Sequence, residues 1–326
     1  MPDDSMCGRK PHPPPRTDDA RRVRQHGEVA LQAAGAEHRP RTAFVLSGGG
    51  NLAVSQVGMM RALLLRGIVP EVVVGTSAGA INGALVATDP TLASVDRLAE
   101  LWTALRSGDM FPGNILSRAW NVLSRDDHLF SNEGLRTIIE HVAPAETFEA
   151  MAVPMRVVAT DLELGEEVVL ASGPLAPALL ASAAIPGVFA PVEHDGRLLV
   201  DGAVTNNVPL SHALAGPVER IYVCNVAGGG AAPTKARSPL DVAVRAFNIS
   251  RNQRFAWELA RLPPGVDVIE LPHPDDERAV LDFSGAAPLI EAACALAGAA
   301  LDAAPAVLAS AARPRRRWPW RRSQVA

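Results

Sequence analysis

The fold is decided by residues 42–87, which read TAFVLSGGGNLAVSQVGMMRALLLRGIVPEVVVGTSAGAINGALVA. An apolar run at 43–46 ends in three glycines, which predicts a buried strand followed by a tight turn. A helical pattern over 52–66 comes next, then a second apolar run at 71–74, a GTSAG turn and a helix over 80–87. This alternation predicts a parallel βαβα unit with a right-handed crossover.

The rest of the chain continues this alternation. Apolar runs predict strands at 155–160, 167–171, 197–200, 220–226 and 266–271. Helical patterns fall at 98–105, 115–123, 132–141, 177–184, 239–262 and 286–303. Strands that alternate with helices indicate an α/β fold around a central, mostly parallel sheet. With 326 residues, the chain is long enough for one large domain.

Composition divides the chain into three regions. Residues 1–40 combine clustered prolines with alternating charges, which predicts a disordered arm. Residues 41–305 carry the alternating pattern and form the expected domain. Within it, 91–150 is expected to be mostly helical and to lie over a site as a cap. Residues 306–326 form a basic tail.

Charge is distributed unevenly along the chain. The net charge is −4, but residues 1–41 sum to +2, residues 313–326 to +6 and the remaining residues 42–312 to −12. A protein attracts nucleic acid over a distance when it presents an overall basic field. Because this chain has none, no nucleic-acid partner is expected.

The sequence shows no sign of secretion. Its first residues hold acids and prolines where a signal peptide would be apolar, and the apolar stretch 171–192 is interrupted by four prolines, so no membrane span is predicted. Cys7, Cys224 and Cys294 have no paired spacing, which predicts reduced thiols. We therefore expect a cytoplasmic location.

The basic tail adds a membrane contact to this expectation. Residues 313–322 hold six arginines together with Trp318 and Trp320. Arginine attracts anionic headgroups and tryptophan prefers the membrane interface. The segment Arg313–Arg322 therefore predicts peripheral contact with the inner membrane surface, with a solvated tail as the alternative.

The strongest chemical signal is Gly75-Thr76-Ser77-Ala78-Gly79. A G-x-S-x-G pattern between a strand and a helix is typical of a nucleophile elbow, a sharp corner that pushes the serine hydroxyl out of the sheet edge. The N-terminus of the following helix favours negative charge there. Ser77 is the candidate nucleophile, and Gly75 and Gly79 flank it because side chains there would collide with neighbouring strands and helices.

Gly48, Gly49 and Gly50 follow the first predicted strand. Adjacent parallel strands bring their C-terminal loops side by side, so this loop is expected beside Ser77. Successive glycines let backbone N–H groups converge, which suits an oxyanion hole. A plain tight turn and a phosphate cradle for a nucleotide are the alternatives. The pattern lacks both the acidic residue of a dinucleotide site and the Gly-Lys-Ser/Thr of a P-loop.

Asp201 and Gly202 follow the predicted strand at 197–200. A carboxylate at a strand end can face a cleft and accept a proton from Ser77, although Asp-Gly is also a common turn. Histidine is the usual base for serine. Three histidines later in the chain keep a Ser–Asp–His triad open as the alternative: His194, His212 and His273.

Five motifs in a fixed order resemble the patatin-like phospholipases. They are Gly48–Gly50, Gln56-Val57-Gly58, Gly75–Gly79, Ala183-Ala184-Ile185-Pro186-Gly187 and Asp201-Gly202-Ala203, and the resemblance covers residues 42–303. It implies a three-layer α/β/α fold and hydrolysis of lipid esters by a Ser77–Asp201 dyad without histidine. It also implies that Gly48, Gly49 and Gly50 supply oxyanion-hole amides, with no cofactor or metal.

One departure from the family bears on the substrate. The family usually has Gly-Gly-Gly-x-Arg/Lys-Gly, and here Asn51, Leu52 and Ala53 follow the glycines. Loss of the cation weakens attraction for a phosphate headgroup. We expect hydrolysis of acyl esters (of the phospholipase A, lysophospholipase or esterase type) rather than strict phospholipid specificity. A lipid-binding protein without catalysis is the further alternative.

Overall fold

The computed structural model describes residues 41–105, 128–143, 145–227, 250–251, 253–275 and 283–308. The predicted arm at 1–40, the predicted helix at 115–123 and the segment Arg313–Arg322 lie outside these residues.

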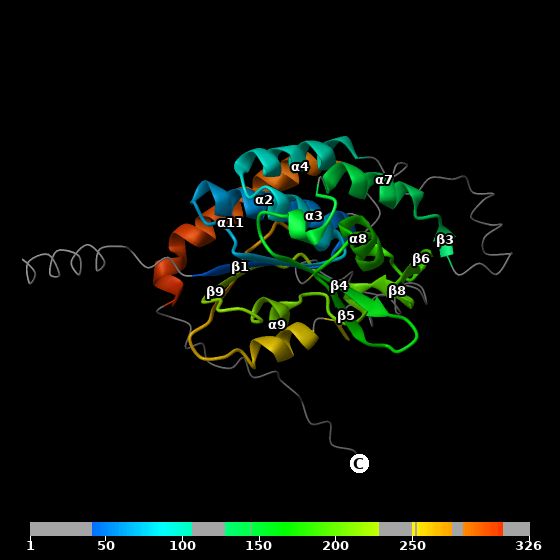
Figure 1. Cartoon of the computed structure of the whole chain (residues 1–326). Helices are drawn as coiled ribbons and strands as arrows, with labels where there is room; N and C mark the ends of the chain where they lie inside the picture. The colour runs from blue at the N-terminus through cyan, green and yellow to red at the C-terminus, as the bar shows by residue number, and fades with distance from the viewer. Residues whose placement is uncertain are drawn as a thin grey trace, which may run out of the picture. The chain divides into compact units, whose positions relative to one another are not determined.

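The described part of the chain is built on an eight-stranded sheet with the order β10-β9-β1-β2-β4-β8-β7, and β5 pairs with β4 (Figure 1). The strands from β10 to β4 are parallel, whereas β5, β8 and β7 join by antiparallel pairing. The strand bounds are β1 Thr42–Leu46, β2 Val72–Thr76, β4 Met155–Asp161, β5 Glu167–Leu170, β7 Val192–His194, β8 Arg197–Asp201, β9 Arg220–Cys224 and β10 Asp267–Glu270.

The register on β4 brings two strand ends together. Thr76, the last residue of β2, lies opposite Val158 of β4. Asp201, the last residue of β8, lies opposite the next residue, Ala159. Because β2 is parallel to β4 and β8 is antiparallel to it, their C-terminal ends meet along one side of β4.

Helices cover both faces of the sheet (Figure 1). The upper layer in this view contains α2 Val54–Leu65, α3 Ala78–Thr88, α4 Leu92–Ala104, α7 Glu133–Val142, α8 Leu175–Ala183 and α11 Ala286–Leu308. The lower layer contains α9 Leu210–Ala213 and the helical residues 253–259. The described residues also form three short 3-10 turns: η1 Gly50–Ala53, η2 Phe148–Ala150 and η3 Gly202–Val204.

Alternation along the strands divides the core between these two layers. Phe44 and Leu46 of β1 join the larger apolar cluster, which contains α2 and α3. Ala43 and Val45 join a second cluster with residues of α9 and of the lower helix. Successive strand residues point to opposite faces, so β1 feeds both cores. The three-layer α/β/α fold is confirmed.

Short elements account for the main differences from the predicted pattern. The 91–150 region contains α4 and α7, as expected, but also strand β3, His128–Phe130, which pairs in parallel with β6, Gly187–Phe189. Neither β6 nor β7 was predicted. Each has three residues, too few to show an alternating pattern in the sequence.

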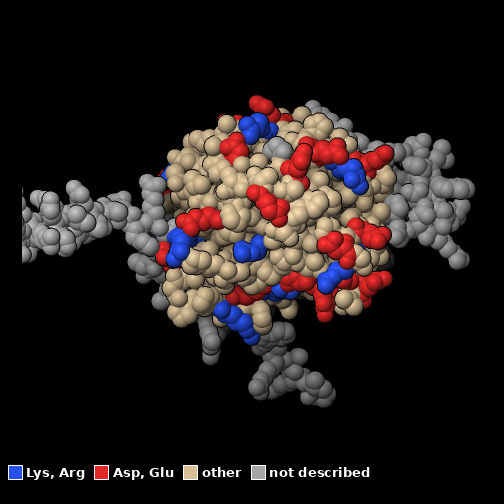
Figure 2. All heavy atoms as spheres, viewed as in Figure 1, with Lys and Arg blue, Asp and Glu red and all other residues tan. Residues whose placement is uncertain are grey.

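Helix α11 packs against α2 at a glycine. A Cβ on Gly58 would lie 2.2 Å from the carbonyl oxygen of Ile290, so the two backbones touch. Exposed ion pairs border this contact, from Arg61 to Glu291 and from Arg66 to Asp302. On the face shown in Figure 2, acidic and basic side chains are interspersed over a mostly neutral surface. Exposed pairs contribute little to stability, so the close backbone packing holds α11 in place.

Helix α11 is also apolar enough to cross a membrane. The 18 residues Ala286–Ala303 are long and apolar enough by length and composition alone. The sequence-based prediction of no membrane span did not anticipate this. One third of this stretch is buried inside the protein, including Ile290, Ala293 and Ala297. Core helices of globular proteins meet the same criteria, and the contact with α2 accounts for the apolar face.

The α2–α11 contact predicts that Gly58→Ala destabilises the fold. Alanine is the better helix former by about 1 kcal/mol, so without the contact the substitution would be stabilising. The added methyl group meets backbone atoms that cannot move aside, so we expect a net loss of about 1–3 kcal/mol in the free energy of unfolding. Urea denaturation measures it, with Gly216→Ala, a site outside the helices where a Cβ meets open space, as the control for the added methyl group. A more stable Gly58→Ala protein would contradict this packing.

Candidate active site

Ser77 lies at the sharp corner between β2 and α3. Its backbone has φ 55° and ψ −129°, a left-handed conformation that is strained for a residue with a side chain. The neighbouring glycines permit this corner, because a Cβ on Gly79 would lie 2.4 Å from the carbonyl oxygen of Ser47 and one on Gly75 would lie 2.6 Å from Ala80 Cα. The predicted elbow geometry is therefore present at Ser77.

The Ser77 hydroxyl donates a hydrogen bond to Asp201. The distance from Ser77 Oγ to Asp201 Oδ2 is 2.6 Å, and both residues are at least 95% buried. The other carboxylate oxygen, Oδ1, accepts the backbone N–H of Ala203 at 2.8 Å. A Cβ on Gly202 would lie 2.1 Å from the carbonyl oxygen of Val158, so the residue after Asp201 must be glycine. The structure thus joins two residues that lie 124 positions apart in the sequence.

Burial raises the pKa of Asp201 to about 6. Desolvation is the main cause, and the hydrogen bonds from Ser77 and Ala203 and the charge of Arg251 oppose it. An aspartate with this pKa is a stronger base than one in water and is still ionised at neutral pH.

Ser182 and Ala184 hold this pair from the adjacent segment. The backbone N–H of Ser77 donates to Ser182 Oγ at 2.9 Å, and that hydroxyl donates to the carbonyl of Val158 at 2.6 Å. The N–H of Asp201 donates to the carbonyl of Ala184 at 2.9 Å. The motif at 183–187 therefore belongs to a segment that supports both residues, and no local sequence pattern marks the role of Ser182.

The glycine loop lies beside Ser77, as predicted, but its three residues differ in role. A Cβ on Gly48 would lie 3.1 Å from Ser77 Cβ, so the loop and the serine touch. The N–H of Gly48 donates to the carbonyl of Asn207 at 3.1 Å, which corrects the prediction that it is an oxyanion-hole donor. Within the described residues, no partner occupies the N–H groups of Gly49 and Gly50. Gly50 has φ 57° and lines a cavity together with Ser77.

The loop after Asp201 supports both neighbouring segments. Thr76 Oγ1 donates to the carbonyl of Asn206 at 2.9 Å, which ties down the end of β2. The carbonyl of Asn207 receives the Gly48 amide. Thr160 Oγ1 donates to the carbonyl of Asp201 itself at 3.1 Å. One loop thus fixes the nucleophile strand, the glycine loop and the carboxylate.

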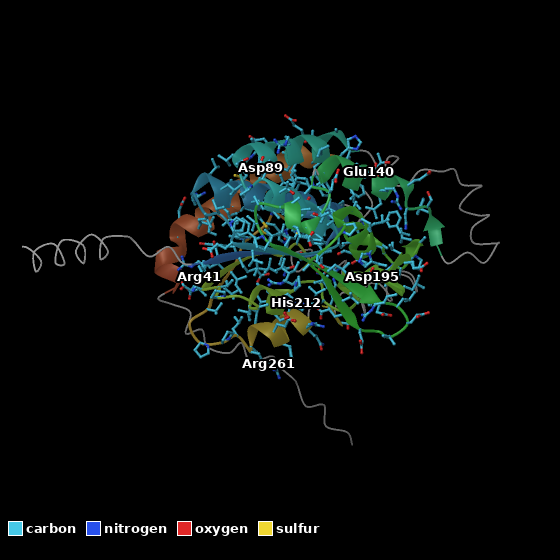
Figure 3. The ribbon with its side chains drawn as sticks, in the orientation of Figure 1. Arg41, Asp89, Glu140, Asp195, His212 and Arg261 are labelled. Carbon is cyan, nitrogen blue, oxygen red and sulfur yellow. The ribbon has the colours of Figure 1, made fainter. Side chains whose placement is uncertain are left out.

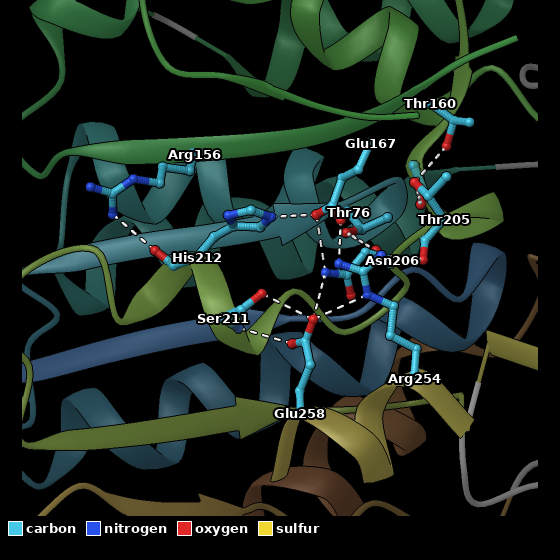
Figure 4. Close-up of polar contacts among 11 residues, drawn as sticks. Thr76, Arg156, Thr160, Glu167, Thr205, Asn206, Ser211, His212, Arg254 and Glu258 are labelled. Carbon is cyan, nitrogen blue, oxygen red and sulfur yellow. Dashed lines mark hydrogen bonds and ion pairs between the residues drawn. The ribbon is translucent and has the colours of Figure 1, made fainter. Parts of the chain in front are cut away.

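A polar network beneath the sheet holds this loop in turn (Figure 4). Asn206 Nδ2 donates to Glu167 Oε1 at 3.1 Å and to Glu258 Oε1 at 3.2 Å. Arg254 pairs with both glutamates, and His212 pairs with Glu167. Burial would raise the pKa of Glu167, but the hydrogen bond and charge of His212 and the charge of Arg254 outweigh it and lower that pKa. No local sequence pattern marks any of these links.

None of the three predicted histidines reaches the serine. His212 projects from α9 beneath the sheet and contacts Glu167 (Figures 3 and 4). His194 lies 3.7 Å from Asp195, and His273 bonds to the carbonyl of Pro274. Among the described residues, Asp201 is the only side chain that accepts a hydrogen bond from the Ser77 hydroxyl. The geometry therefore disfavours a triad built on any of these histidines.

A cavity of about 360 Å³ opens onto Ser77 between the helices of the upper layer. Helices α4 and α7, from the region expected to cap a site, form much of its wall. Among the described residues that line it there is no Lys, Arg, Asp or Glu, and His141 is its titratable group. Its apolar lining includes Ile81, Leu98, Leu101, Trp102, Leu105, Leu135, Ile138, Val142, Ile185, Phe189 and Phe283. Within the described residues no group of three His, Cys, Asp or Glu side chains could hold a metal ion.

The sequence resemblance implied this arrangement. It is a serine at a strand–helix corner of an α/β/α fold, hydrogen-bonded to a buried aspartate. The model of the patatin-like phospholipase family matches residues 44–214, just over half of the chain. The chain therefore belongs to the patatin-like phospholipase family.

Individual relatives agree with this assignment. An uncharacterized NTE family protein of Mycobacterium tuberculosis is 31% identical over 211 residues, which cover 65% of this chain and 56% of that protein. Patatin-like phospholipase domain-containing protein 7 of Rattus norvegicus is 31% identical over 169 residues, 51% of this chain and 12% of that protein. This chain thus spans about half the length of the mycobacterial relative.

A solved structure overlaps more broadly but more weakly. Human GIVD cytosolic phospholipase A2, in complex with methyl gamma-linolenyl fluorophosphonate, is 12% identical with a TM-score of 0.47, covering 91% of this chain and 63% of that one. At this level the likeness adds nothing to the family assignment, which rests on the sequence match.

The raised pKa of Asp201 predicts that Asp201→Asn stabilises the protein at alkaline pH. Asp201 ionises near pH 3.8 when unfolded and near pH 6 when folded, so above pH 6 the folded state bears the cost of a buried charge. A shift of this size corresponds to roughly 3 kcal/mol. The neutral amide avoids that cost, so the gain should be largest at pH 8 and should disappear toward pH 4. Urea unfolding at both pH values measures it, and an equal effect at the two pH values would count against the burial of the charge.

Proposed function

We propose that this protein is a lipid acyl hydrolase that cleaves carboxylic esters with Ser77 as nucleophile and Asp201 as general base. The observation that carries the proposal is the 2.6 Å hydrogen bond between Ser77 Oγ and Asp201 Oδ2 at the end of an apolar cavity. Membership of the patatin-like phospholipase family supports the same activity.

The proposed reaction has two halves. Asp201 takes the hydroxyl proton as Ser77 Oγ attacks the ester carbonyl, and the resulting tetrahedral oxyanion collapses with release of the alcohol, which receives that proton. Asp201 then takes a proton from water, whose oxygen attacks the acyl-serine. Collapse of the second intermediate releases the fatty acid and returns the proton to Ser77.

Backbone amides are the proposed oxyanion donors. The N–H groups of Gly49 and Gly50 lie in the loop that touches Ser77, and Gly50 lines the cavity. The N–H of Ala78, directly after the nucleophile, is the usual second donor at such an elbow. A donor of this kind contributes about 2.7–4 kcal/mol to transition-state stabilisation, which a weak carboxylate base requires.

The cavity supports an acyl chain as the part of the substrate that it holds. Its described walls are mostly apolar and contain no Lys, Arg, Asp or Glu, which suits a hydrocarbon chain better than a phosphate. Leu52 stands where the family usually has a cation, so we infer that the ester and its chain contribute more to recognition than a charged headgroup. Phospholipid, lysophospholipid and simple lipid esters are the substrate class.

The proposed nucleophile predicts labelling of Ser77 by a fluorophosphonate probe. Folded wild-type protein should gain the probe on the peptide that contains Ser77, and Ser77→Ala should neither label nor hydrolyse p-nitrophenyl esters. Mass spectrometry of the labelled peptide measures this, with urea-denatured wild type as the control that must stay unlabelled. An unlabelled but folded wild type that still binds lipid would favour the lipid-binding alternative.

The proposed base predicts that kcat/KM rises with pH through an inflection near pH 6, because Asp201 must be ionised to accept the proton. Histidine titrates in the same range. The profile is therefore repeated in His141→Gln and His212→Gln, which remove the cavity histidine and one of the three candidate triad histidines. Both variants should keep the inflection, whereas its loss in either would indicate a histidine base.

We also propose that the protein is cytoplasmic and contacts the inner membrane surface through Arg313–Arg322, a segment outside the described residues. The sequence supports this through its six arginines and two tryptophans. Sedimentation with anionic vesicles, compared with neutral vesicles and with a variant whose six arginines are replaced by serine, tests it.

A further inference from the structure

A chain of hydrogen-bonded side chains runs from the cavity wall to the glycine loop. Trp102 Nε1 donates to Asn82 Oδ1 at 2.9 Å, and Asn82 Nδ2 donates to Gln56 Oε1 at 3.0 Å. Gln56 Nε2 then donates to the carbonyl of Ser47 at 2.8 Å and to that of Cys224 at 3.0 Å. Ser47 is the residue directly before Gly48. Three of these bonds join helices α4, α3 and α2 to the residue after β1, and the fourth reaches the last residue of β9.

The hydrogen-bonding chemistry permits one orientation of this chain. The indole nitrogen can only donate, so Asn82 must present its oxygen to Trp102. Its amide nitrogen then faces Gln56, which must present its own oxygen there. Gln56 therefore offers its nitrogen to two carbonyls, which can only accept. Asn82 and Gln56 are fully buried, so a reversed amide at either position would leave polar atoms unpaired.

Each end of the chain belongs to a different part of the proposed site. Trp102 lines the cavity and stacks on Phe283, with ring centroids 6.0 Å apart. At the other end, the carbonyl of Ser47 accepts a hydrogen bond from Gln56 Nε2, and Ser47 Oγ accepts one from the N–H of Val226 at 3.0 Å. The loop that carries Gly49 and Gly50 thus begins at a residue held by this chain.

We infer that Trp102 is a positioning residue for the glycine loop, acting through Asn82 and Gln56, as well as part of the acyl-chain cavity. The inference rests on the proposed function. One hydrogen-bonded unit then fixes two parts of the site. These are the cavity wall that contacts the acyl chain and the backbone amides that donate hydrogen bonds to the oxyanion. A small displacement of such donors costs catalysis steeply, because their value depends on preorganised geometry.

The test separates this role from simple contact with the acyl chain. Trp102→Phe keeps an aromatic ring in the cavity but removes the indole N–H, which leaves Asn82 Oδ1 without its donor. The substrate is p-nitrophenyl acetate. Its two-carbon acyl group is far smaller than the cavity of about 360 Å³, so lost contact with a long acyl chain cannot explain a change in kcat.

We expect Trp102→Phe to lower kcat for the acetate ester about tenfold, with KM changed by less than about twofold, because the defect lies in the oxyanion loop and not in binding. Asn82→Leu breaks the same chain at its middle and should have the same effect. Trp257→Phe, the same substitution at a tryptophan exposed on another part of the surface, is the matched control. Unchanged kcat for the acetate ester in both Trp102→Phe and Asn82→Leu would overturn the inference.

A second measurement tests the chain independently of catalysis. Hydrogen exchange followed by mass spectrometry should show faster exchange in the peptide spanning 44–54 in Trp102→Phe than in wild type or Trp257→Phe, while the β4 peptide keeps its protection. Equal exchange in the 44–54 peptide would overturn the inference. If wild-type protein does not hydrolyse esters, the proposed function fails, and the exchange result still decides whether Trp102 holds the loop.

Discussion

The rest of the site depends on the meeting of two strand ends along β4. A parallel strand, β2, and an antiparallel strand, β8, use consecutive positions on the same side of β4. Their final residues therefore face each other, and a corner at one and a turn at the other suffice to bring Ser77 to Asp201. A shift of one residue in the β8 pairing would turn the carboxylate of Asp201 to the opposite face of the sheet, since strand side chains alternate.

Around this junction, side chains from both helical layers form hydrogen bonds that hold the backbone of the site. From above, Ser182 and Gln56 hold the backbones of Ser77 and Ser47. From below, the network of Glu167, Asn206 and Glu258 holds the loop after Asp201. Hydrogen bonds between buried groups are strengthened by the low local dielectric, so these contacts favour one geometry. The strained serine and the desolvated aspartate are thus held in place by surroundings that supply neither nucleophile nor base.

The features visible in the sequence are those set by local conformation. The glycines of 48–50, the corner at Ser77 and the Asp201-Gly202 turn follow from short-range steric requirements, and the strands of four or more residues follow from apolar runs. The register of β8 on β4 and the chain from Trp102 to Ser47 join residues far apart in the sequence, and nothing local marks them. The engagement of the Gly48 amide by Asn207 was hidden for the same reason, since backbone partners leave no trace in residue identity.

The packing of α11 and β9 determines how much of this protein is needed to fold on its own. The family match ends at residue 214, yet β9 pairs with the whole length of β1. Helix α11 also packs closely against α2 at Gly58. A fragment cut at 214 would expose an open edge on the strand that leads into the glycine loop, together with an uncovered apolar helix face. Such edges promote aggregation. The boundaries of the shared family sequence therefore fall inside a single folding unit.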